Sequence, residues 1–493
     1  MSEHTDSNEG HLVRGRREKH EAVLAAGGYP HRFERSHLAG DLQEKYFDLE
    51  PASETTDRVT VAGRLMLHRS FGKLQFGTVH DVSGSIQLFV ERSTAVDEVA
   101  ERFSELDLGD WVGASGVVMT TMKGELSVKV DSLTLLQKAL RPLPDKWHGL
   151  VDIETRSRQR FVDLMVNPEA RRTALIRSGV VSALRREFEA RGFVEVETPI
   201  LLGQATGALA RPFVTHHNAL DIDLQLRIAT ELYLKRLVVG GIEKVFEIGR
   251  IFRNEGIDAT HNPEFTMLEA YQAFADYADI MDLVEEIVSS VALHAVGSHR
   301  VPYQGRDLSF SPPFARLKLT DLVSGFVGET VDYDTDPHRL GELLADRGVE
   351  ADRSWGPGKR LFELYELALE EIWDPTFVID FPTEVSPLSQ KSPTDPRVTE
   401  RFELVIAGAE YCNAFSELND ADDQRSRFEA QAAARAAGNQ EAHVIDDDYI
   451  RALEYGLPPT GGLGIGVDRL VMLLTDQPHI REVILFPTLR PES

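Results

Sequence analysis

One stretch in the middle of the chain combines the residue types of a nucleotide pocket. Its two β-like runs, 245–253 and 264–271, flank a polar loop that contains Gly256, which predicts a hairpin. Alternation along the second run gives one shared face: Phe265, Met267, Glu269 and Tyr271. The loop adds Arg253, Glu255, His261 and Asn262. An aromatic plane, a guanidinium and a carboxylate in one pocket suit a flat base, a phosphate and a cation. An ordinary hairpin with a solvated loop is the alternative.

A second predicted hairpin supplies further carboxylates. Its runs, 404–406 and 410–415, flank a short turn, and Glu403 and Glu410 come on either side of that turn. Magnesium prefers oxygen ligands and commonly takes one or two carboxylates together with nucleotide phosphates, so this pair is a candidate Mg2+ site. Two solvated carboxylates on an acidic protein are the alternative. Alternation on the second run gives another shared face: Tyr411, Asn413, Phe415 and Glu417.

The third candidate element is rich in glycine. The run 461–469 holds four glycines and ends at Arg469, beside which a helix is predicted to begin. Glycines let a backbone approach a ligand closely. The spacing is not that of a dinucleotide-binding fingerprint, and the Gly-x-x-x-x-Gly-Lys-Ser/Thr pattern of a phosphate-binding loop is absent, so both of those sites are disfavoured.

Short β-rich runs separated by turns characterise the N-terminal part of the chain. There are five of them: 59–67, 74–82, 86–91, 111–120 and 126–136. This pattern predicts a small five-stranded barrel, the oligonucleotide-binding (OB) fold. Phe71, Phe76 and Gln87 lie on or just before its second and third strands, the surface on which such barrels stack and read bases. Burial of either phenylalanine in the core is the alternative.

Changes in composition and in predicted secondary structure divide the chain into four parts. We expect an N-terminal extension with a basic helix (1–56), the OB-fold domain (57–137), a proline-containing linker (138–155) and a large domain (156–493). The basic helix carries Arg14, Arg16, Arg17 and Lys19, a set that fits an RNA contact and a solvated surface equally well. In the large domain, Asn167-Pro168 opens a predicted amphipathic helix that runs to Ala190 and is followed by a strand.

Composition excludes several classes of protein. The 493 residues are 42% hydrophobic and 27% charged, as in globular proteins with more than one domain. No apolar run approaches the roughly 18 residues of a membrane span, and a polar start is not a signal peptide. The single cysteine, Cys412, excludes an internal disulfide and fits the cytoplasm. A net charge of −27 does not exclude RNA, since affinity depends on local basic patches.

The first hairpin resembles a known family. The segment from Phe252-Arg253-Asn254-Glu255 to Glu269 is similar to the second signature motif of class II aminoacyl-tRNA synthetases, with spacing like that of bacterial-type lysyl-tRNA synthetases (class IIb). The helix–strand–proline unit ending at Pro199 resembles the first motif, and the run 461–469 resembles the third. The resemblance extends from about residue 9 to residue 491. It implies an α+β architecture in which an OB-fold barrel precedes a catalytic domain with an antiparallel sheet flanked by helices, and it implies a homodimer.

The resemblance also implies an ATP site. Arg253 and Arg469 would be the catalytic cations on the phosphates, and Glu403 and Glu410 would hold Mg2+. The implied ATP-binding set is Arg253, Glu255, His261, Asn262, Phe265, Glu403 and Arg469. No Ser/His/Asp triad is required, because activation of a carboxylate by ATP depends on positioning and on stabilising phosphate charge.

The amino acid implied is L-lysine, and the RNA partner implied is tRNA(Lys). An acidic pocket favours a substrate with a second ammonium group over aspartate or asparagine. The implied lysine-binding set is Gly207, Glu231, Arg253, Glu269, Tyr271, Asn413, Phe415 and Glu417. Four residues match positions that lysyl enzymes use on the anticodon: Arg69, Phe76, Gln87 and Glu125.

Some positions depart from the usual lysyl pattern. Cys412-Asn413-Ala414-Phe415 stands where Gly-Asn-Gly-Phe is common, Thr206-Gly207-Ala208-Leu209 replaces a Gly-Gly-Ala-Ala run, and Thr230 replaces a proline. These departures raise the hypothesis of a second lysyl enzyme with altered inhibitor tolerance or a modified-lysine substrate. Two other rivals are a relative that lysylates a protein and a non-catalytic RNA-binding paralogue. The predicted barrel argues against the first rival, and the intact cation and carboxylate set argues against the second.

Overall fold

The structure, a computed structural model, describes residues 3–93, 97–144, 150–208, 210–436 and 445–491. The chain divides into two compact units, Met1–Leu150 and Val151–Ser493. The division falls within the range 138–155 that the sequence analysis assigns to a linker, part of which lies outside the described residues. Among the described residues, no helix is both long enough and apolar enough to cross a membrane.

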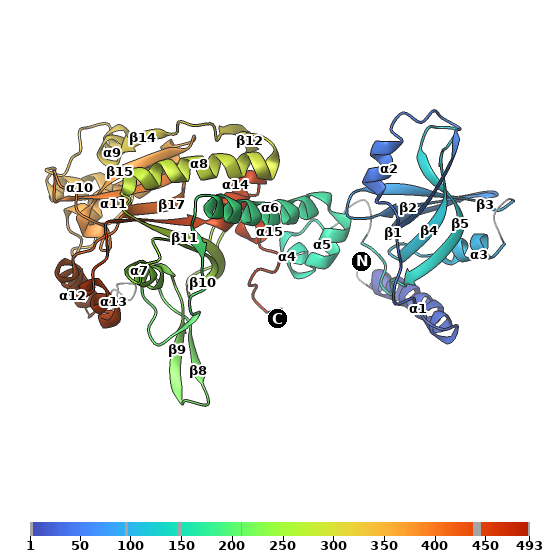
Figure 1. Cartoon of the computed structure of the whole chain (residues 1–493), viewed down its shortest axis with the longest axis horizontal. Helices are drawn as coiled ribbons and strands as arrows, with labels where there is room; N and C mark the ends of the chain where they lie inside the picture. Colours follow the sequence, from blue (N-terminus) through green and yellow to red (C-terminus); the bar gives the residue numbers. More distant parts are fainter. Residues whose placement is uncertain (1–2, 94–96, 145–149, 209, 437–444, 492–493) are drawn as a thin grey trace. The chain divides into compact units, whose positions relative to one another are not determined.

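The first unit is built around a closed five-stranded barrel with the order β1-β2-β3-β5-β4 (Figure 1). Its strands are β1 (Glu54–Phe71), β2 (Leu74–His80), β3 (Ser85–Glu91), β4 (Trp111–Thr120) and β5 (Leu126–Gln137). Buried and outward residues alternate strictly along β2 and β3, as the pattern requires when one face packs on a core. The helix α3 (Asp97–Glu105) follows β3 and buries Phe103 in that core. The predicted OB-fold is confirmed.

The N-terminal helix α1 (Glu3–Ala25) uses part of its basic patch for structure. Arg16 is buried and donates to the backbone carbonyls of Ala139 (3.0 Å) and Arg141 (2.9 Å). Lys19 pairs with Asp107 at 2.9 Å. Arg14, Arg17 and Lys19 remain exposed, so only Arg16 is withdrawn from contact with an RNA. A short helix, α2 (Ala39–Lys45), precedes the barrel.

The second unit contains an eight-stranded sheet with the order β14-β15-β16-β17-β18-β11-β10-β6. The strands are β14 (Ala315–Lys318), β15 (Thr376–Pro382), β16 (Val398–Ile406), β17 (Ala409–Ser416), β18 (Thr460–Gly466), β11 (Glu264–Ala273), β10 (Lys244–Phe252) and β6 (Val194–Glu195). The six strands from β15 to β10 are antiparallel, and the two edge strands pair in parallel. Both predicted hairpins are present, as β10–β11 and β16–β17. The predicted α+β class is confirmed.

Three helices cover one face of this sheet. They are α6 (Pro168–Ala190), α8 (Tyr277–Val296) and α14 (Val467–Leu474), and Figure 1 shows α6 and α8 lying along the sheet. Asn167 caps α6 by accepting a hydrogen bond from the Glu169 amide, and Pro168 occupies the first turn, where its missing N–H costs nothing. The apolar stripe with Val180, Leu184 and Phe188 packs into the main core. This covered face leaves the other face of the sheet for polar side chains.

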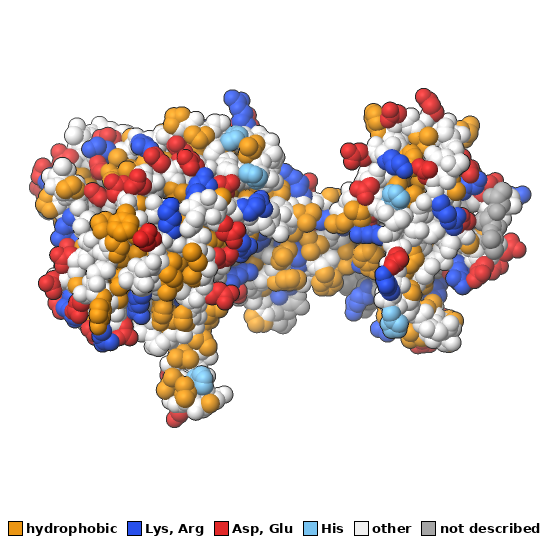
Figure 2. Space-filling view, viewed as in Figure 1, with side chains coloured by type: hydrophobic (Ala, Val, Ile, Leu, Met, Phe, Trp, Pro, Cys, Tyr) orange, Lys and Arg blue, Asp and Glu red, His pale blue; other side chains and the backbone are white. Residues whose placement is uncertain are grey.

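The remaining elements surround the sheet. They are α4 (Ile153–Arg158), α5 (Arg160–Val166), β7 (Leu201–Leu202), β8 (Val214–His217), β9 (Ile222–Leu226), α7 (Glu231–Val239), β12 (Arg300–Tyr303), β13 (Arg306–Ser309), α9 (Leu319–Val327), α10 (Pro337–Ala345), α11 (Pro357–Ala368), the 3₁₀ turns η1 (Leu369–Glu371) and η2 (Thr383–Val385), α12 (Ala421–Ala436), α13 (Asp447–Glu454) and α15 (Ile480–Val483). The helices α9, α10 and α11 form a helical region with its own core. The face in Figure 2 carries acidic and basic side chains interspersed over the second unit.

Candidate active site

A cavity of about 520 Å³ lies on the polar face of the second unit's sheet. Its floor is β18, which runs between β11 and β17. Gly464 pairs with Glu269 on one side and with Asn413 on the other, and Gly462 pairs with Tyr271 and Phe415. A Cβ at Gly462 would lie 2.0 Å from Glu417 Oε1 and 2.5 Å from the Tyr271 ring. The glycines of β18 therefore keep open the track into which side chains of both neighbouring strands project.

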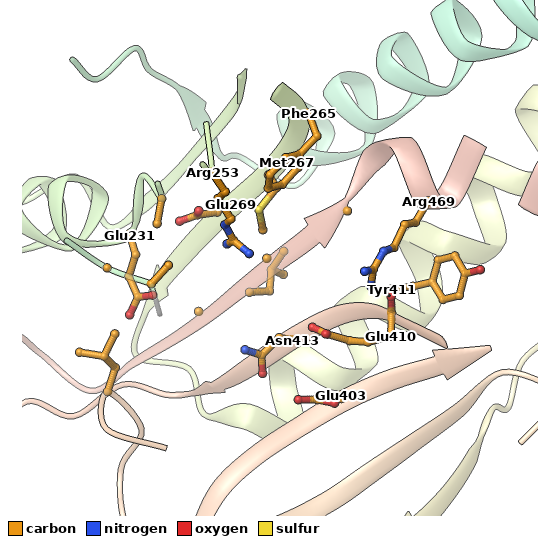
Figure 3. Close-up of a pocket in the computed structure, with 18 of the residues that line it drawn as sticks. Glu231, Arg253, Phe265, Met267, Glu269, Glu403, Glu410, Tyr411, Asn413 and Arg469 are labelled. Carbon is orange, nitrogen blue, oxygen red and sulfur yellow. Dashed lines mark hydrogen bonds between the residues drawn. The ribbon is translucent and has the colours of Figure 1, made fainter. Parts of the chain in front are cut away.

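Cationic and aromatic groups line one end of the cavity (Figure 3). The Arg253 guanidinium lies 5.2 Å from the Phe265 ring centroid. Arg469, on the first turn of α14, donates to the Glu410 carbonyl (2.9 Å) and lies 3.2 Å from His261 Nε2. Burial lowers the pKa of Arg253, and the charges of nearby carboxylates, Glu255 first, oppose that shift. Two cations held beside an aromatic plane form the arrangement expected for a nucleotide polyphosphate.

Asn262 offers an unused acceptor at this end. Its Nδ2 donates to the Glu264 carbonyl at 2.6 Å, while its buried Oδ1 has no partner among the described residues. A buried polar atom without a hydrogen bond is costly, so this oxygen is expected to be satisfied by a ligand donor. Glu255 and His261 also line the cavity.

Glu403 and Glu410 converge below Arg469, next to Asn413 (Figure 3). Glu403 is buried, and its oxygens accept from the Tyr365 hydroxyl (2.7 Å) and Arg401 Nη2 (2.6 Å). Burial and then the charge of Glu410 raise the pKa of Glu403 to about 8. Glu410 reaches this face because the β16–β17 register shifts at Leu404/Val405, a bulge that simple alternation does not predict.

Acidic groups line the opposite end. Glu269 is buried, and it accepts hydrogen bonds from the Thr230 amide (3.1 Å) and the Tyr271 hydroxyl (3.3 Å). Burial and then the charge of Glu231 raise the pKa of Glu269 to about 7, against the hydrogen bonds from Thr230. Glu231 begins α7, and Glu417 is buried and forms an ion pair with Lys235. Three buried carboxylates favour a ligand that carries positive charge.

The cavity brings together every predicted residue of the second unit. Those at the ATP end are Arg253, Glu255, His261, Asn262, Phe265, Glu403, Glu410 and Arg469, and those at the acidic end are Gly207, Glu231, Glu269, Tyr271, Asn413, Phe415 and Glu417. Gly207 has a φ of +94°, and a Cβ there would lie 3.2 Å from Ala229 Cβ. Two of the departures noted in the sequence, Cys412 and Ala414, are buried in the main core rather than in the cavity, and Leu209 lies outside the described residues.

Four residues that contact the carboxylates of the cavity were not predicted as site residues from the sequence. They are Thr230, Lys235, Tyr365 and Arg401. Lys235 stands four residues after Glu231, and this spacing on a helix could have predicted their ion pair from the sequence. Tyr365 comes from the inserted helix α11, whose docking on the sheet no local pattern indicates.

The predicted anticodon residues lie on or beside one side of the barrel. Arg69 pairs with Phe76 across β1 and β2, and Gln87 of β3 accepts from the Ser127 hydroxyl at 3.1 Å. Phe76 faces outward between Phe71 (6.3 Å) and Phe89 (5.4 Å), so it is not a core residue. Phe71 is 64% exposed. Glu125 is exposed just before β5.

Comparison with known proteins agrees with this geometry. Residues 152–490 match the family of class II tRNA synthetases (D, K and N), and residues 59–136 match the OB-fold nucleic acid binding domain. The chain is 52% identical over 483 residues to a lysine–tRNA ligase of Prochlorococcus marinus (strain MIT 9211), covering 95% of this chain and 96% of the relative. It is 51% identical over 490 residues to a lysine–tRNA ligase of Enterococcus faecalis, covering 98% of both chains. The chain therefore belongs to the class II tRNA synthetases, within the lysine–tRNA ligase family.

Proposed function

We propose that this chain is a cytoplasmic lysine–tRNA ligase, which activates L-lysine with ATP and then transfers lysine to the 3′ end of tRNA(Lys). The observation that carries the proposal is that opposite ends of one cavity carry opposite charges. Its cationic end holds Arg253 and Arg469, and its acidic end holds Glu231, Glu269 and Glu417. A substrate with two ammonium groups and one carboxylate fits across these ends when the carboxylate points toward the cations.

In the first step, a lysine carboxylate oxygen attacks the α-phosphorus of ATP. The bond from that phosphorus to the bridging oxygen breaks, and pyrophosphate leaves with its electron pair. We place Arg253 on the α-phosphate and the lysine carboxylate, Arg469 on the distal phosphates, and Phe265 against the adenine. Fixed cations stabilise the charge that spreads over the phosphate oxygens, and they need no reorganisation to do so. In the second step, a ribose hydroxyl of the tRNA attacks the mixed anhydride and AMP leaves.

The residues at the carboxylate pair fit Mg2+. Glu403 and Glu410 offer hard oxygen donors, and no group of three or more His, Cys, Asp or Glu that could hold a metal is found among the described residues. A site with only two carboxylates suits Mg2+ shared with nucleotide phosphates, because this ion usually keeps waters and phosphate oxygens as its other ligands. Bound there, Mg2+ would neutralise charge on the departing pyrophosphate. Tyr365 and Arg401 hold Glu403 in place.

We also propose a homodimer built by the second unit. Large apolar side chains are exposed on and near α5, α6 and the strands that follow: Phe161, Leu175, Val194, Ile200 and Leu201. Exposed apolar surface of this kind is typical of an interface with another chain. Sedimentation equilibrium of the protein is expected to give twice the 55.1 kDa chain mass.

Phe76 is expected to contribute to tRNA binding but not to lysine activation. Because an aromatic ring that stacks on a base contributes about 1–3 kcal/mol, Phe76→Ala should raise the KM for tRNA(Lys) by roughly 5–150-fold. Lysine-dependent ATP–pyrophosphate exchange should keep its wild-type rate. Phe47→Ala is the matched control, since Phe47 is 83% exposed in the same unit and belongs to no strand of the barrel. An unchanged KM for tRNA in Phe76→Ala would remove Phe76 from the anticodon surface.

The pKa of Glu269 predicts a pH dependence of lysine binding. An ammonium ligand requires the carboxylate, so affinity is lost as the pH falls through about 7. The dissociation constant for lysine, measured by calorimetry without ATP, should fall about tenfold from pH 6 to pH 8. Thr230→Pro removes the amide that donates to Glu269 and should shift this profile to higher pH, whereas Thr230→Ser keeps it. A profile that is flat, or identical in Thr230→Pro, contradicts this role for Glu269.

Two assays separate the competing functions. Lysine-dependent ATP–pyrophosphate exchange followed by charging of tRNA(Lys) supports the ligase. Exchange without charging would favour a relative that lysylates a protein. Absence of exchange would favour an RNA-binding paralogue.

A further inference from the structure

A buried cation that the proposed reaction does not use lies behind the acidic end of the cavity. Lys235, on α7, is fully buried and does not line the cavity. Its Nζ contacts Glu231 Oε1 at 2.5 Å and forms a second ion pair with Glu417. Both of these carboxylates do line the cavity. The ammonium therefore pairs from within the protein with two groups that a ligand meets from the other side.

The surroundings of Lys235 are specific for a cation. Three rings face its Nζ from three different elements: Phe415 of β17 at 5.4 Å, Tyr271 of β11 at 5.8 Å and Tyr449 of α13 at 5.9 Å. Aromatic faces attract an ammonium but cannot replace a hydrogen-bond acceptor. The titratable groups around it are Glu231 on α7, Glu269 and Tyr271 on β11, Glu417 after β17, and Tyr449 on α13. Burial lowers the pKa of Lys235, but the charges of Glu231 and Glu417 outweigh burial and keep the ammonium charged.

The charges at this end add up to a simple balance. When Glu231, Glu269 and Glu417 are ionised they carry three negative charges, and the ammonium of Lys235 compensates one of them. Two negative charges remain, which equals the number of ammonium groups on lysine. The lysine carboxylate faces Arg253 and is balanced there.

We propose that Lys235 is a specificity-determining positioning residue, an internal counter-ion that pairs with Glu231 and Glu417 and favours the charged form of Glu417, so that the pocket suits a diammonium substrate. This inference rests on the proposed function. Burial raises the pKa of Glu417 well above its ordinary value, and the charge of Lys235 is the largest effect that opposes this rise. Without Lys235, a larger share of Glu417 would be protonated, and lysine would have to displace that proton in order to bind.

The test measures protons as well as affinity. Lysine binding is followed by calorimetry at pH 7 in buffers of different ionisation enthalpy, which gives the number of protons released per lysine bound. Lys235→Met should release more protons per lysine bound than wild type, by up to about one. It should bind lysine about tenfold more weakly for each unit by which the pKa of Glu417 rises, and most of this loss should disappear at pH 8.5. Lys235→Arg keeps the charge and should retain the wild-type proton count.

The outcomes separate the two proposals. If wild type binds no lysine, the proposed function fails and this inference fails with it. If wild type binds lysine and Lys235→Met releases the same number of protons, or loses the same affinity at pH 7 and pH 8.5, the counter-ion role is wrong and Lys235 is only structural. Thermal unfolding of both variants shows whether they are folded. Should Lys235→Met not fold, a proton count in Lys235→Arg that differs from wild type overturns the proposal.

Discussion

Replacing Glu417 by glutamine is expected to abolish most lysine activation. Glu417 is buried, lines the cavity and forms an ion pair with Lys235. Removing one member of a buried charge pair costs about 3–5 kcal/mol, so kcat/KM for lysine should fall roughly a hundredfold to a few thousandfold. The measurement is lysine-dependent ATP–pyrophosphate exchange at saturating ATP.

The KM for ATP should stay near the wild-type value in this variant, because Glu417 lies at the other end of the cavity from Arg469. Glu454→Gln is the matched control, since Glu454 is an exposed acid on α13. If Glu417→Gln formed lysyl-adenylate as fast as wild type, the acidic end would not be the lysine site.

Replacing Arg253 by alanine is expected to produce the second large loss. Its guanidinium lies between the acidic end and Arg469, stacked near Phe265, where a carboxylate and an α-phosphate would meet (Figure 3). Removing one preorganised donor from a transition state costs about a hundredfold to a thousandfold in kcat. Arg253→Lys should recover little, because an ammonium cannot make the two parallel hydrogen bonds of a guanidinium.

Single-turnover formation of lysyl-adenylate measures this effect without interference from tRNA charging. Arg250→Ala is the control on the same hairpin, since Arg250 does not line the cavity. A wild-type rate in Arg253→Ala would assign phosphate stabilisation to other groups.

Local patterns predicted those parts of the site that depend on alternation. Phe265, Glu269 and Tyr271 share a face because even numbers of residues separate them on a regular strand, and the structure places them in one cavity. The OB-fold strands were predictable for the same reason, since buried and outward residues alternate along β2 and β3. The resemblance supplied the roles, which alternation alone does not give.

Features that depend on distant packing could not be predicted. The bulge that turns Glu410 toward Asn413 comes from the register between β16 and β17, and no short window of sequence specifies it. Tyr365 reaches Glu403 across 38 positions of sequence. The glycines of β18 were expected at a ligand, but their pairing between Glu269 and Asn413 was not. In the sequence Lys235 cannot be distinguished from an ordinary lysine on a helix, because its contact with Glu417 depends on tertiary packing.

The central claim is that the acidic end of the cavity selects a diammonium amino acid for joining to AMP at the cationic end. ATP–pyrophosphate exchange with each of the twenty amino acids, ornithine and β-lysine tests it most directly. We predict strong exchange with lysine, about 10–200-fold lower kcat/KM with ornithine because one methylene is missing, and background rates with neutral and acidic side chains. A preference for β-lysine over lysine would favour the hypothesis that this chain is a second lysyl enzyme with a modified-lysine substrate. Exchange supported by a neutral or acidic amino acid and not by lysine would contradict the account.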